Sequence, residues 1–420
     1  MKKGEKIVLE IENISTEGYG VGRASGFVVF CPGGLPGDKI LARVIQVRRR
    51  YAESEVLEVL SPSVYRAAAA CPDFLACGGC AWQEMDYGAQ LDFKRQIVVD
   101  ALKRIGGVDV PVAEVAGMTN PWGYRNKAVF AVSSDGVVGM YAGRSRRIAA
   151  ISRCALQHPF HEEVLRVLQD YCRKNPGFVS KLMIRIGESG AMVSLAADGD
   201  EMSGQSELAA DLAGLGATTF IVSERVVFGD GFITERIGGI LYQLSAKSFF
   251  QVNTVQAKVL YDTALKLAVL KGFERVIDAH AGVGGMALYA AQQAFDVLGM
   301  DIEAAAVKDA MQNAKLNNIS NAKFVRAAAE DLIPKLLTQG GGFKPDIVFL
   351  NPPRKGCGNR LLAALTAAGI GKIVYTSCDP ATLARDVKIL ARGGFRLDAV
   401  CPVDMFPMTP KIETVCLLTR

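Results

Sequence analysis

The sequence predicts a multidomain protein that joins a small N-terminal β-barrel, a central α+β region and a C-terminal α/β domain with a doubly wound, mostly parallel sheet. Three observations predict this fold class. The chain has 420 residues, which exceeds one ordinary hydrophobic core. Its beginning alternates short aliphatic segments with Gly-rich turns, and its last third alternates strands with helices. We expect domains at residues 1–60, 61–240 and 241–420.

The N-terminal segment contains four predicted strands, and small barrels of this kind often bind nucleic acid. The strands are Lys6–Ile14, Gly26–Phe30, Ile40–Val47 and Ser54–Leu60. Three arginines, residues 48–50, follow the third strand. A solvated surface run explains such a triplet more often than a nucleic-acid contact does.

The central region carries the net charge of the protein. Its predicted strands are Lys127–Val132, Leu182–Gly187 and Ala191–Ala196. Between Pro121 and Cys154, six Arg and Lys residues stand against one acid, a local charge of +5 that equals the net charge of the whole chain. Such a stretch suits phosphates, although a solvated β-surface would carry the same charges. The candidate nucleic-acid contacts are Arg125, Lys127, Arg144, Arg146 and Arg147.

Composition excludes several classes of protein. The chain has no uninterrupted apolar run long enough to cross a membrane, and its Gly and Pro contents are ordinary for a globular protein. Residues 1–6 lead into a short alternating strand, so we expect no secretory signal peptide and a cytoplasmic protein. The ten cysteines are not expected to form disulfides in that reducing compartment. Some of them should therefore have chemical roles.

The last third reads as a regular alternation of strands and helices. Predicted strands are Arg275–Ala279, Val297–Asp301, Lys323–Arg326, Asp346–Leu350, Lys372–Ser377, Phe395–Val400 and Val415–Leu418. Predicted helices are Gly284–Gln293, Glu303–Asn317, Arg360–Ala368 and Pro380–Ala391.

A glycine-rich turn follows the first of these strands. Gly282 and Gly284 let a ligand approach the backbone, and Asp301, at the end of the next strand, is placed to bind ribose hydroxyls. With Asp278, which precedes the turn, they form a candidate nucleoside site. The turn lacks the three-glycine phosphate fingerprint, which favours S-adenosylmethionine over a dinucleotide.

The tripeptide Asn351-Pro352-Pro353 follows another predicted strand. The prolines end that strand abruptly, so Asn351 is held at its carboxyl end, where open α/β sheets bind ligands. The same tripeptide occurs in enzymes that methylate exocyclic amines of bases. It therefore favours a base-modifying methyltransferase without choosing the base.

Cys378 favours uracil as that base. It ends a predicted strand and precedes a predicted helix, whose N-terminal dipole is expected to favour a thiolate. An amine needs no nucleophilic catalyst. Carbon 5 of uracil does, because a thiolate that adds to carbon 6 makes carbon 5 able to attack a methyl sulfonium. A buried structural cysteine is the alternative.

The same chemistry needs a base to remove the proton from carbon 5. Glu413 stands at the start of the final apolar strand. A surface acid at a strand end is the simpler interpretation from the residues alone.

Three further cysteines form a C-x5-C-x2-C pattern, Cys71, Cys77 and Cys80, which is typical of a metal site that lacks one ligand. Cys154 is the best candidate for the fourth ligand, and Cys172 is its rival. Four thiolates suit either zinc or an iron–sulfur cluster.

Together these residues resemble the RNA 5-methyluridine methyltransferases over nearly the whole chain, with the 23S ribosomal RNA members most similar. The resemblance implies a TRAM barrel (OB-like), a central iron–sulfur domain that binds RNA and a Rossmann-like methyltransferase domain. It also implies that a helix near residues 83–110 packs on the last of these domains. By the same resemblance, a [4Fe-4S] cluster is held by Cys71, Cys77, Cys80 and Cys154.

The resemblance also assigns roles in the active site. The stretch Phe249-Phe250-Gln251-Val252-Asn253 is similar to the family's F-F-Q-x-N motif, whose glutamine contacts cofactor and target base. The other implied roles are cofactor or substrate contacts for His280, Asp301 and Asn351, the nucleophile for Cys378 and the base for Glu413.

Four positions depart from the family pattern. Asn351 stands where many members have Asp, and His280 stands where an aromatic residue is usual. Met408 and Lys411 stand where the final motif commonly has histidines.

We therefore predict a cytoplasmic, monomeric enzyme that uses S-adenosylmethionine to methylate carbon 5 of a uridine in 23S ribosomal RNA. Three alternatives stay open: transfer RNA as the substrate, an amine-directed base methyltransferase for which Cys378 is dispensable, and a non-catalytic RNA-binding or assembly factor with a vestigial methyltransferase fold. The sequence does not identify the uridine.

Overall fold

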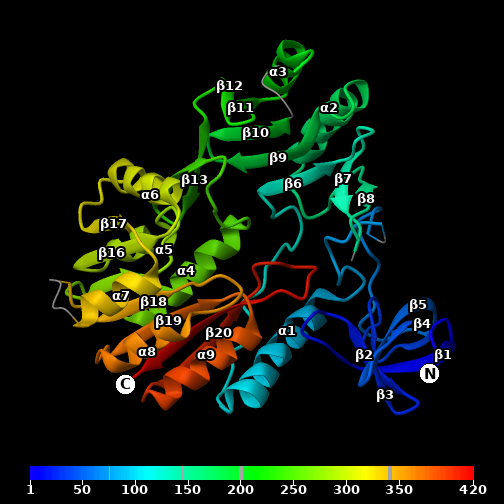
Figure 1. The fold of residues 1–420 in the computed structure, drawn as a ribbon, viewed down its shortest axis with the longest axis horizontal. Helices are drawn as coiled ribbons and strands as arrows, with labels where there is room; N and C mark the ends of the chain where they lie inside the picture. The colour runs from blue at the N-terminus through cyan, green and yellow to red at the C-terminus, as the bar shows by residue number, and fades with distance from the viewer. Residues whose placement is uncertain (75, 144, 198–201, 339–342) are drawn as a thin grey trace.

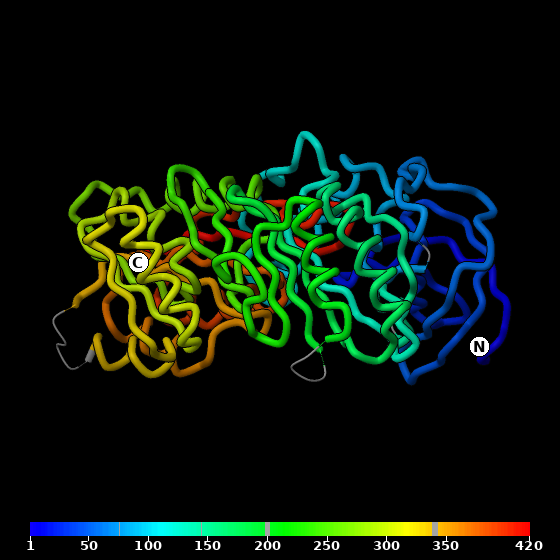
Figure 2. The backbone as a smooth tube through the Cα atoms, turned by 90° about the horizontal axis from the view of Figure 1, so that it is seen from above, coloured from blue at the N-terminus to red at the C-terminus, as the bar shows by residue number. Residues whose placement is uncertain are grey.

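The protein consists of three parts along an elongated molecule (Figures 1 and 2). The computed structural model describes residues 1–74, 76–143, 145–197, 202–338 and 343–420. Figure 2 shows the N-terminal barrel and the C-terminal sheet at opposite ends, and Figure 1 shows the central sheet above both of them. Arg144, one of the predicted nucleic-acid contacts, lies outside the described residues.

The N-terminal part is a closed five-stranded barrel with the strand order β1-β2-β3-β5-β4. Its strands are β1 (Lys6–Ile14), β2 (Gly20–Ala24), β3 (Phe27–Cys31), β4 (Lys39–Val47) and β5 (Tyr51–Ser61). The sequence prediction missed β2, because its glycines resemble a turn. A Cβ on Gly22 would lie 2.3 Å from the carbonyl oxygen of Glu10, so close packing of the barrel wall requires glycine there.

The central part is a seven-stranded sheet with the order β12-β11-β10-β9-β6-β7-β8. Two helices, α2 (Phe160–Lys174) and α3 (Gln205–Gly214), accompany it. The strands are β6 (Lys127–Val132), β7 (Val138–Tyr141), β8 (Ile148–Ala150), β9 (Val179–Gly187), β10 (Gly190–Ala197), β11 (Ala217–Val222) and β12 (Arg225–Phe228).

The C-terminal part is a second seven-stranded sheet with the order β17-β16-β15-β18-β19-β21-β20. The strands are β15 (Arg275–Asp278), β16 (Asp296–Asp301), β17 (Ala322–Arg326), β18 (Ile347–Leu350), β19 (Lys372–Ser377), β20 (Arg396–Val403) and β21 (Glu413–Thr419). All pairs are parallel except those of β21, which runs antiparallel to both neighbours. The doubly wound prediction is confirmed, with β21 as the exception.

Helices cover both faces of this sheet. One apolar core includes residues of α4 (Thr254–Ala268), α5 (Gly285–Ala291) and α6 (Ala304–Leu316). The other includes residues of α7 (Ala329–Thr338), α8 (Asn359–Ala367) and α9 (Pro380–Arg392).

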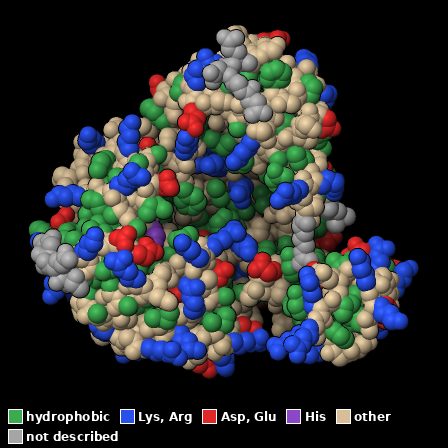
Figure 3. Space-filling view, viewed as in Figure 1, with side chains coloured by type: hydrophobic (Ala, Val, Ile, Leu, Met, Phe, Trp, Pro, Cys, Tyr) green, Lys and Arg blue, Asp and Glu red, His purple; other side chains and the backbone are tan. Residues whose placement is uncertain are grey.

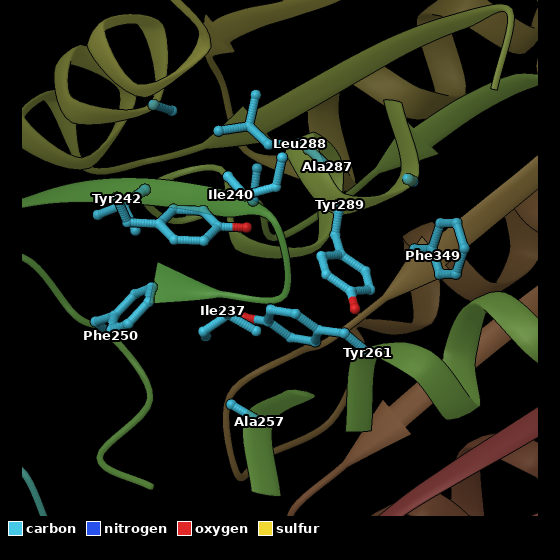
Figure 4. Packing of buried hydrophobic residues seen from close by; sticks show 14 of the residues in the cluster. Ile237, Ile240, Tyr242, Phe250, Ala257, Tyr261, Ala287, Leu288, Tyr289 and Phe349 are labelled. Atoms are coloured by element: carbon cyan, nitrogen blue, oxygen red, sulfur yellow. The ribbon is translucent and has the colours of Figure 1, made fainter. Parts of the chain in front are cut away.

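A hairpin of β13 (Phe232–Ile237) and β14 (Ile240–Ser245) spans the domain boundary predicted at residue 240. Tyr242 of this hairpin packs against Phe250, with ring centroids 5.1 Å apart, in the core that also holds α4 and α5 (Figure 4). The hairpin packs on α4 and also on β9 and β10 of the central sheet, so it joins the two parts.

The helix α1 (Tyr87–Ala101) lies against α9 although it precedes the central sheet in the sequence (Figure 1). A π-helical turn, Leu102–Gly106, extends it. Val98, Ala101 and Leu102 share a core with Leu383 of α9. Among the described residues, no helix is long and apolar enough to cross a membrane.

Candidate active site

The predicted site residues gather at one edge of the C-terminal sheet. β15 ends at Asp278 and β16 at Asp301, while Asn351 and Cys378 directly follow β18 and β19. Strand order reverses beside β15, and ligands of open α/β sheets bind at the carboxyl ends of strands at such a point. Because β21 is antiparallel, its first residue, Glu413, reaches the same edge.

A cleft of about 1570 Å³ opens at this edge and extends to the central part and the barrel. Figure 3 shows a hollow between the three parts, with hydrophobic side chains inside and lysines and arginines nearby. The predicted residues that line the cleft are Gln251, His280, Gly282, Asp301, Asn351, Cys378, Glu413, Arg125, Arg147, Cys77 and Cys80.

Asp301 is held at the cleft by backbone donors. The Gly282 N–H donates to its Oδ2 atom at 3.0 Å, and the Glu303 N–H donates to Oδ1 at 2.9 Å. Gly282 has φ +54°, and a Cβ there would meet no atom within 4 Å. The turn therefore leaves open space beside a carboxylate of fixed orientation, which fits a ribose with two hydroxyl donors.

His280 connects two of the strand ends. The Asn351 N–H approaches its Nδ1 atom at 3.4 Å. Burial lowers the pKa of His280, which keeps the ring neutral and Nδ1 free to accept. A neutral aromatic ring at the cleft can stack on a base.

Asp278 and Gly284 lie behind the cleft wall and do not line it. The Asp278 Oδ1 atom accepts from the His280 N–H at 3.3 Å, whereas its Oδ2 atom is buried without a hydrogen-bond partner. Burial raises the pKa of Asp278 to about 7. Asp278 supports the turn in this structure, and Gly284 begins α5 with φ +87°.

Cys378 and Glu413 are neighbours through sheet register. Ser377 pairs with Thr414 across β19 and β21, so the next residues along each strand, Cys378 and Glu413, also face each other. Both line the cleft. A half-buried thiol thus lies beside a buried carboxyl group.

Burial controls the acidity of both groups. It raises the pKa of the Cys378 thiol to about 11, the charge of Glu413 adds to that rise, and the Arg354 guanidinium opposes it. Burial also raises the pKa of Glu413 to about 8, again against Arg354. The dipole at the start of α9, which is expected to favour a thiolate, is thus opposed at Cys378 by desolvation.

Sequence reasoning missed two residues of the cleft. Arg354 follows the Asn-Pro-Pro tripeptide and acts on the pKa of both Cys378 and Glu413; its place directly after that motif was the available signal. Phe249 is 71% exposed although aromatic, and it lines the cleft. An exposed ring there offers a surface on which a base can stack.

Comparisons with known proteins identify the family. A model described as tRNA (Uracil-5-)-methyltransferase matches residues 221–420, and a TRAM domain model matches residues 1–57. RNA methyltransferases of Halalkalibacterium halodurans and Listeria innocua are each 37% identical to the whole chain, over 98% of their own length. The chain belongs to the RNA uracil-5-methyltransferase family.

A solved structure supports the same conclusion across all three parts. The tRNA (uracil-54, C5)-methyltransferase of Pyrococcus abyssi, in complex with S-adenosyl-L-homocysteine, matches with a TM-score of 0.79 and 27% identity. The match covers 98% of this chain and 99% of that one. The protein is an S-adenosylmethionine-dependent RNA methyltransferase with an N-terminal TRAM barrel, as predicted.

In this methyltransferase the four predicted ligand cysteines approach one another. The Cys71 Sγ atom lies 3.8 Å from the carbonyl oxygen of Arg153, the residue before Cys154. Burial raises the pKa of Cys77, Cys80 and Cys154, and the nearby cysteine side chains add to the rise. The Ser152 N–H donates to Asp73 at 2.8 Å and ties the two cysteine segments together.

The cysteines are close without forming a closed metal site. Within the described ranges, no group of three or more His, Cys, Asp or Glu side chains is arranged to hold a metal ion. Cys172, the rival fourth ligand, is buried in the core beneath the central sheet.

The predicted RNA contacts lie in two environments, some in the cleft and some outside it. Arg125 and Arg147 line the cleft. Arg146 is exposed beside it. Lys127 is half-buried, and burial together with Arg185, Lys181 and Arg125 lowers its pKa to about 8. Several positively charged side chains that lie close together and partly buried favour the binding of a phosphate group.

Proposed function

We propose that this methyltransferase methylates carbon 5 of a specific uridine in 23S ribosomal RNA. The observation that carries the proposal is the proximity of Cys378 to Glu413, just beyond the paired residues Ser377 and Thr414, in the cleft that Asp301 also lines. A thiol beside a carboxyl group supplies the nucleophile and the base that this reaction needs. Ribosomal RNA as the substrate follows from the resemblance described above, and the TRAM barrel does not choose between substrates, because the tRNA methyltransferase of Pyrococcus abyssi matches this chain over 98% of its length.

The cofactor side of the cleft would be formed by Gln251, His280, Gly282, Asp301 and Asn351. When bound, S-adenosylmethionine would supply an electrophilic methyl group from its sulfonium, and the electron pair of the broken S–CH3 bond would stay on sulfur, which leaves S-adenosyl-L-homocysteine. Asp301 would accept from the ribose hydroxyls, and Asn351 and Gln251 would orient the base and the cofactor. Asp278 would act through the turn, because it does not reach the cleft.

Cys378 begins the reaction. Its thiolate forms a bond to carbon 6 of the uracil, and the displaced electron pair makes carbon 5 the atom that takes the methyl group. Glu413 then removes the proton from carbon 5. The electron pair of that C–H bond restores the C5–C6 double bond and expels the Cys378 thiolate.

The base must leave its stack to reach Cys378. Arg125 and Arg147 from the central part would hold the phosphates of the opened loop, and Phe249 would stack on a base. Arg146 and Lys127 would extend this contact along the backbone.

The rate of methylation is expected to rise with pH. Both groups must lose a proton, and their pKa values lie at about 8 for Glu413 and about 11 for Cys378. The kcat/KM of the wild-type protein should therefore climb steeply up to pH 8 and more gently above it. A profile measured from pH 6 to 9.5, with a slope on the order of a hundredfold per pH unit below pH 8 and tenfold per unit above it, checks this. A flat profile would contradict the roles of both groups.

We also propose that Cys71, Cys77, Cys80 and Cys154 bind a [4Fe-4S] cluster with a structural role. The Cys71 Sγ atom lies 3.8 Å from the carbonyl oxygen beside Cys154, which places the two cysteine segments together, and iron–sulfur clusters prefer four thiolates. Uracil methylation transfers no net electrons to or from the protein, so the cluster needs no redox function.

Replacement Cys71→Ser is expected to remove the cluster and destabilise the segment around it. The purified wild-type protein should be brown, with a thiolate-to-iron absorption band that the variant lacks, whereas a zinc protein would be colourless. Cys172→Ser serves as the matched control and should keep the band. A Cys71→Ser protein that stayed soluble and fully active would contradict the structural role.

Transfer of labelled methyl groups to purified 23S ribosomal RNA and to transfer RNA tests the substrate. We expect 5-methyluridine in the ribosomal RNA alone. Methylation of transfer RNA alone would favour the activity named for the Pyrococcus abyssi relative. Calorimetry with S-adenosylmethionine distinguishes an active enzyme from a vestigial fold. A vestigial fold would not bind the cofactor and would release no heat.

A further inference from the structure

Glu413, the residue proposed as the base, lies at the end of the loop that connects β20 to β21. Val403, the last residue of β20, pairs with Glu413, the first residue of β21. The connection between them, residues 404–412, therefore starts and ends at the pair that contains the carboxyl group. How this connection is held determines where Glu413 lies relative to Cys378.

A buried ion pair holds the first part of the connection. The Lys94 ammonium on α1 lies 2.6 Å from Asp404 Oδ1, and both side chains are completely buried. Lys94 also donates to the carbonyl oxygen of Phe406 at 3.1 Å, and the Tyr87 hydroxyl donates to Asp404 Oδ2 at 2.9 Å. An interior ion pair is costly to desolvate, but it can specify one geometry.

A glutamine on the same helix holds the middle of the connection. The Gln90 Oε1 atom accepts from the Met408 N–H at 2.9 Å. The Trp82 N–H donates to the Met408 carbonyl oxygen at 3.1 Å. Met408 has φ +66°, a strained backbone conformation for a residue with a side chain, which persists only when its surroundings hold it.

Side chains at the start of α4 also hold the backbone of the connection. The Gln256 side-chain amide donates to the Asp404 carbonyl oxygen at 3.1 Å, and that of Asn253 donates to the Met405 carbonyl oxygen at 3.1 Å. Two helices far apart in the sequence thus fix the backbone of one loop. None of these side chains lines the cleft.

We propose that Lys94 and Gln90 are positioning residues for proton removal, which act through Asp404 and Met408 to place the Glu413 carboxyl group at carbon 5. This inference rests on the proposed function, in which Glu413 is the base. Loosening the loop should therefore slow the second half of the reaction, after methyl transfer, and leave the addition of Cys378 to carbon 6 intact.

The double variant Lys94→Met/Asp404→Asn tests the inference, because it removes both buried charges together. We expect a covalent protein–RNA adduct to accumulate on a denaturing gel and kcat to fall on the order of 10²-fold, the cost of a small misplacement of a catalytic group. The KM for RNA and the affinity for S-adenosylhomocysteine should stay unchanged. Lys103→Met/Asp109→Asn, which removes an exposed ion pair, is the matched control and should form no adduct.

Tyr87→Phe keeps the inference testable if the double variant does not fold, because it removes only the hydroxyl that donates to Asp404 Oδ2. It should show the same adduct with a smaller loss of kcat. Normal turnover without adduct in the folded variants would overturn the inference, as would a fall in rate that is matched by a loss of RNA and cofactor affinity. If Glu413→Gln itself forms no adduct, the proposed role of Glu413 fails first.

Discussion

Cys378→Ala is expected to abolish methylation while leaving S-adenosylmethionine binding measurable. The thiol forms the bond to carbon 6 in the proposed reaction, and no neighbouring group can replace it. Loss of a nucleophile costs on the order of 10⁴-fold or more in rate. The cofactor side of the cleft, with Asp301 and His280, lies on other strand ends and should bind as before by calorimetry.

Cys401→Ala provides the matched control for this variant. Cys401 is a partly buried cysteine on β20 that does not line the cleft. Its replacement should leave the rate near that of the wild type. Full activity of Cys378→Ala would overturn the mechanism and favour an amine-directed methyltransferase instead.

Glu413→Gln is expected to trap a covalent adduct between Cys378 and methylated RNA. Glutamine keeps the shape of the side chain but cannot accept the proton of carbon 5, so elimination of the thiolate should slow by about 10²–10⁴-fold. Adduct on a denaturing gel, with label from both RNA and methyl group, measures this directly.

The combination of Glu413→Gln with Cys378→Ala is the control and should give no adduct.

The Glu413→Gln replacement also removes a carboxyl group whose ionisation is opposed by burial. Because the pKa of Glu413 is raised to about 8 in the folded protein, the wild type loses stability as pH rises from the ordinary carboxyl range toward 8. Glu413→Gln should not show that loss in thermal unfolding at different pH values. Unslowed product release by this variant would place the base elsewhere.

Local sequence patterns predicted much of the fold. β1, β6 and β19 have the predicted bounds, because each is a continuous run of residues suited to a strand. β2 was missed because its glycines serve close packing within the barrel. The packing of a helix near residues 83–110 on the C-terminal domain was predicted from family resemblance, since no local pattern encodes a contact between segments so far apart; its contact with α9 came from the structure.

The site was predicted less completely than the fold. Cys378 could be recognised from its position after a strand, but its contact with Glu413 depends on the antiparallel insertion of β21. The raised pKa of Cys378 depends on burial by the folded cleft, which a helix-dipole argument omits. Lys94 and Gln90 resembled ordinary helix residues until the structure placed them on the loop before Glu413.

Mapping of 5-methyluridine in total RNA from cells with and without the gene tests the central claim most directly. We expect at least one uridine of 23S ribosomal RNA to lose its 5-methyl group when the gene is deleted. Wild-type protein should restore it, and Cys378→Ala should not. Loss of 5-methyluridine from transfer RNA alone, or an unchanged map, would contradict the account.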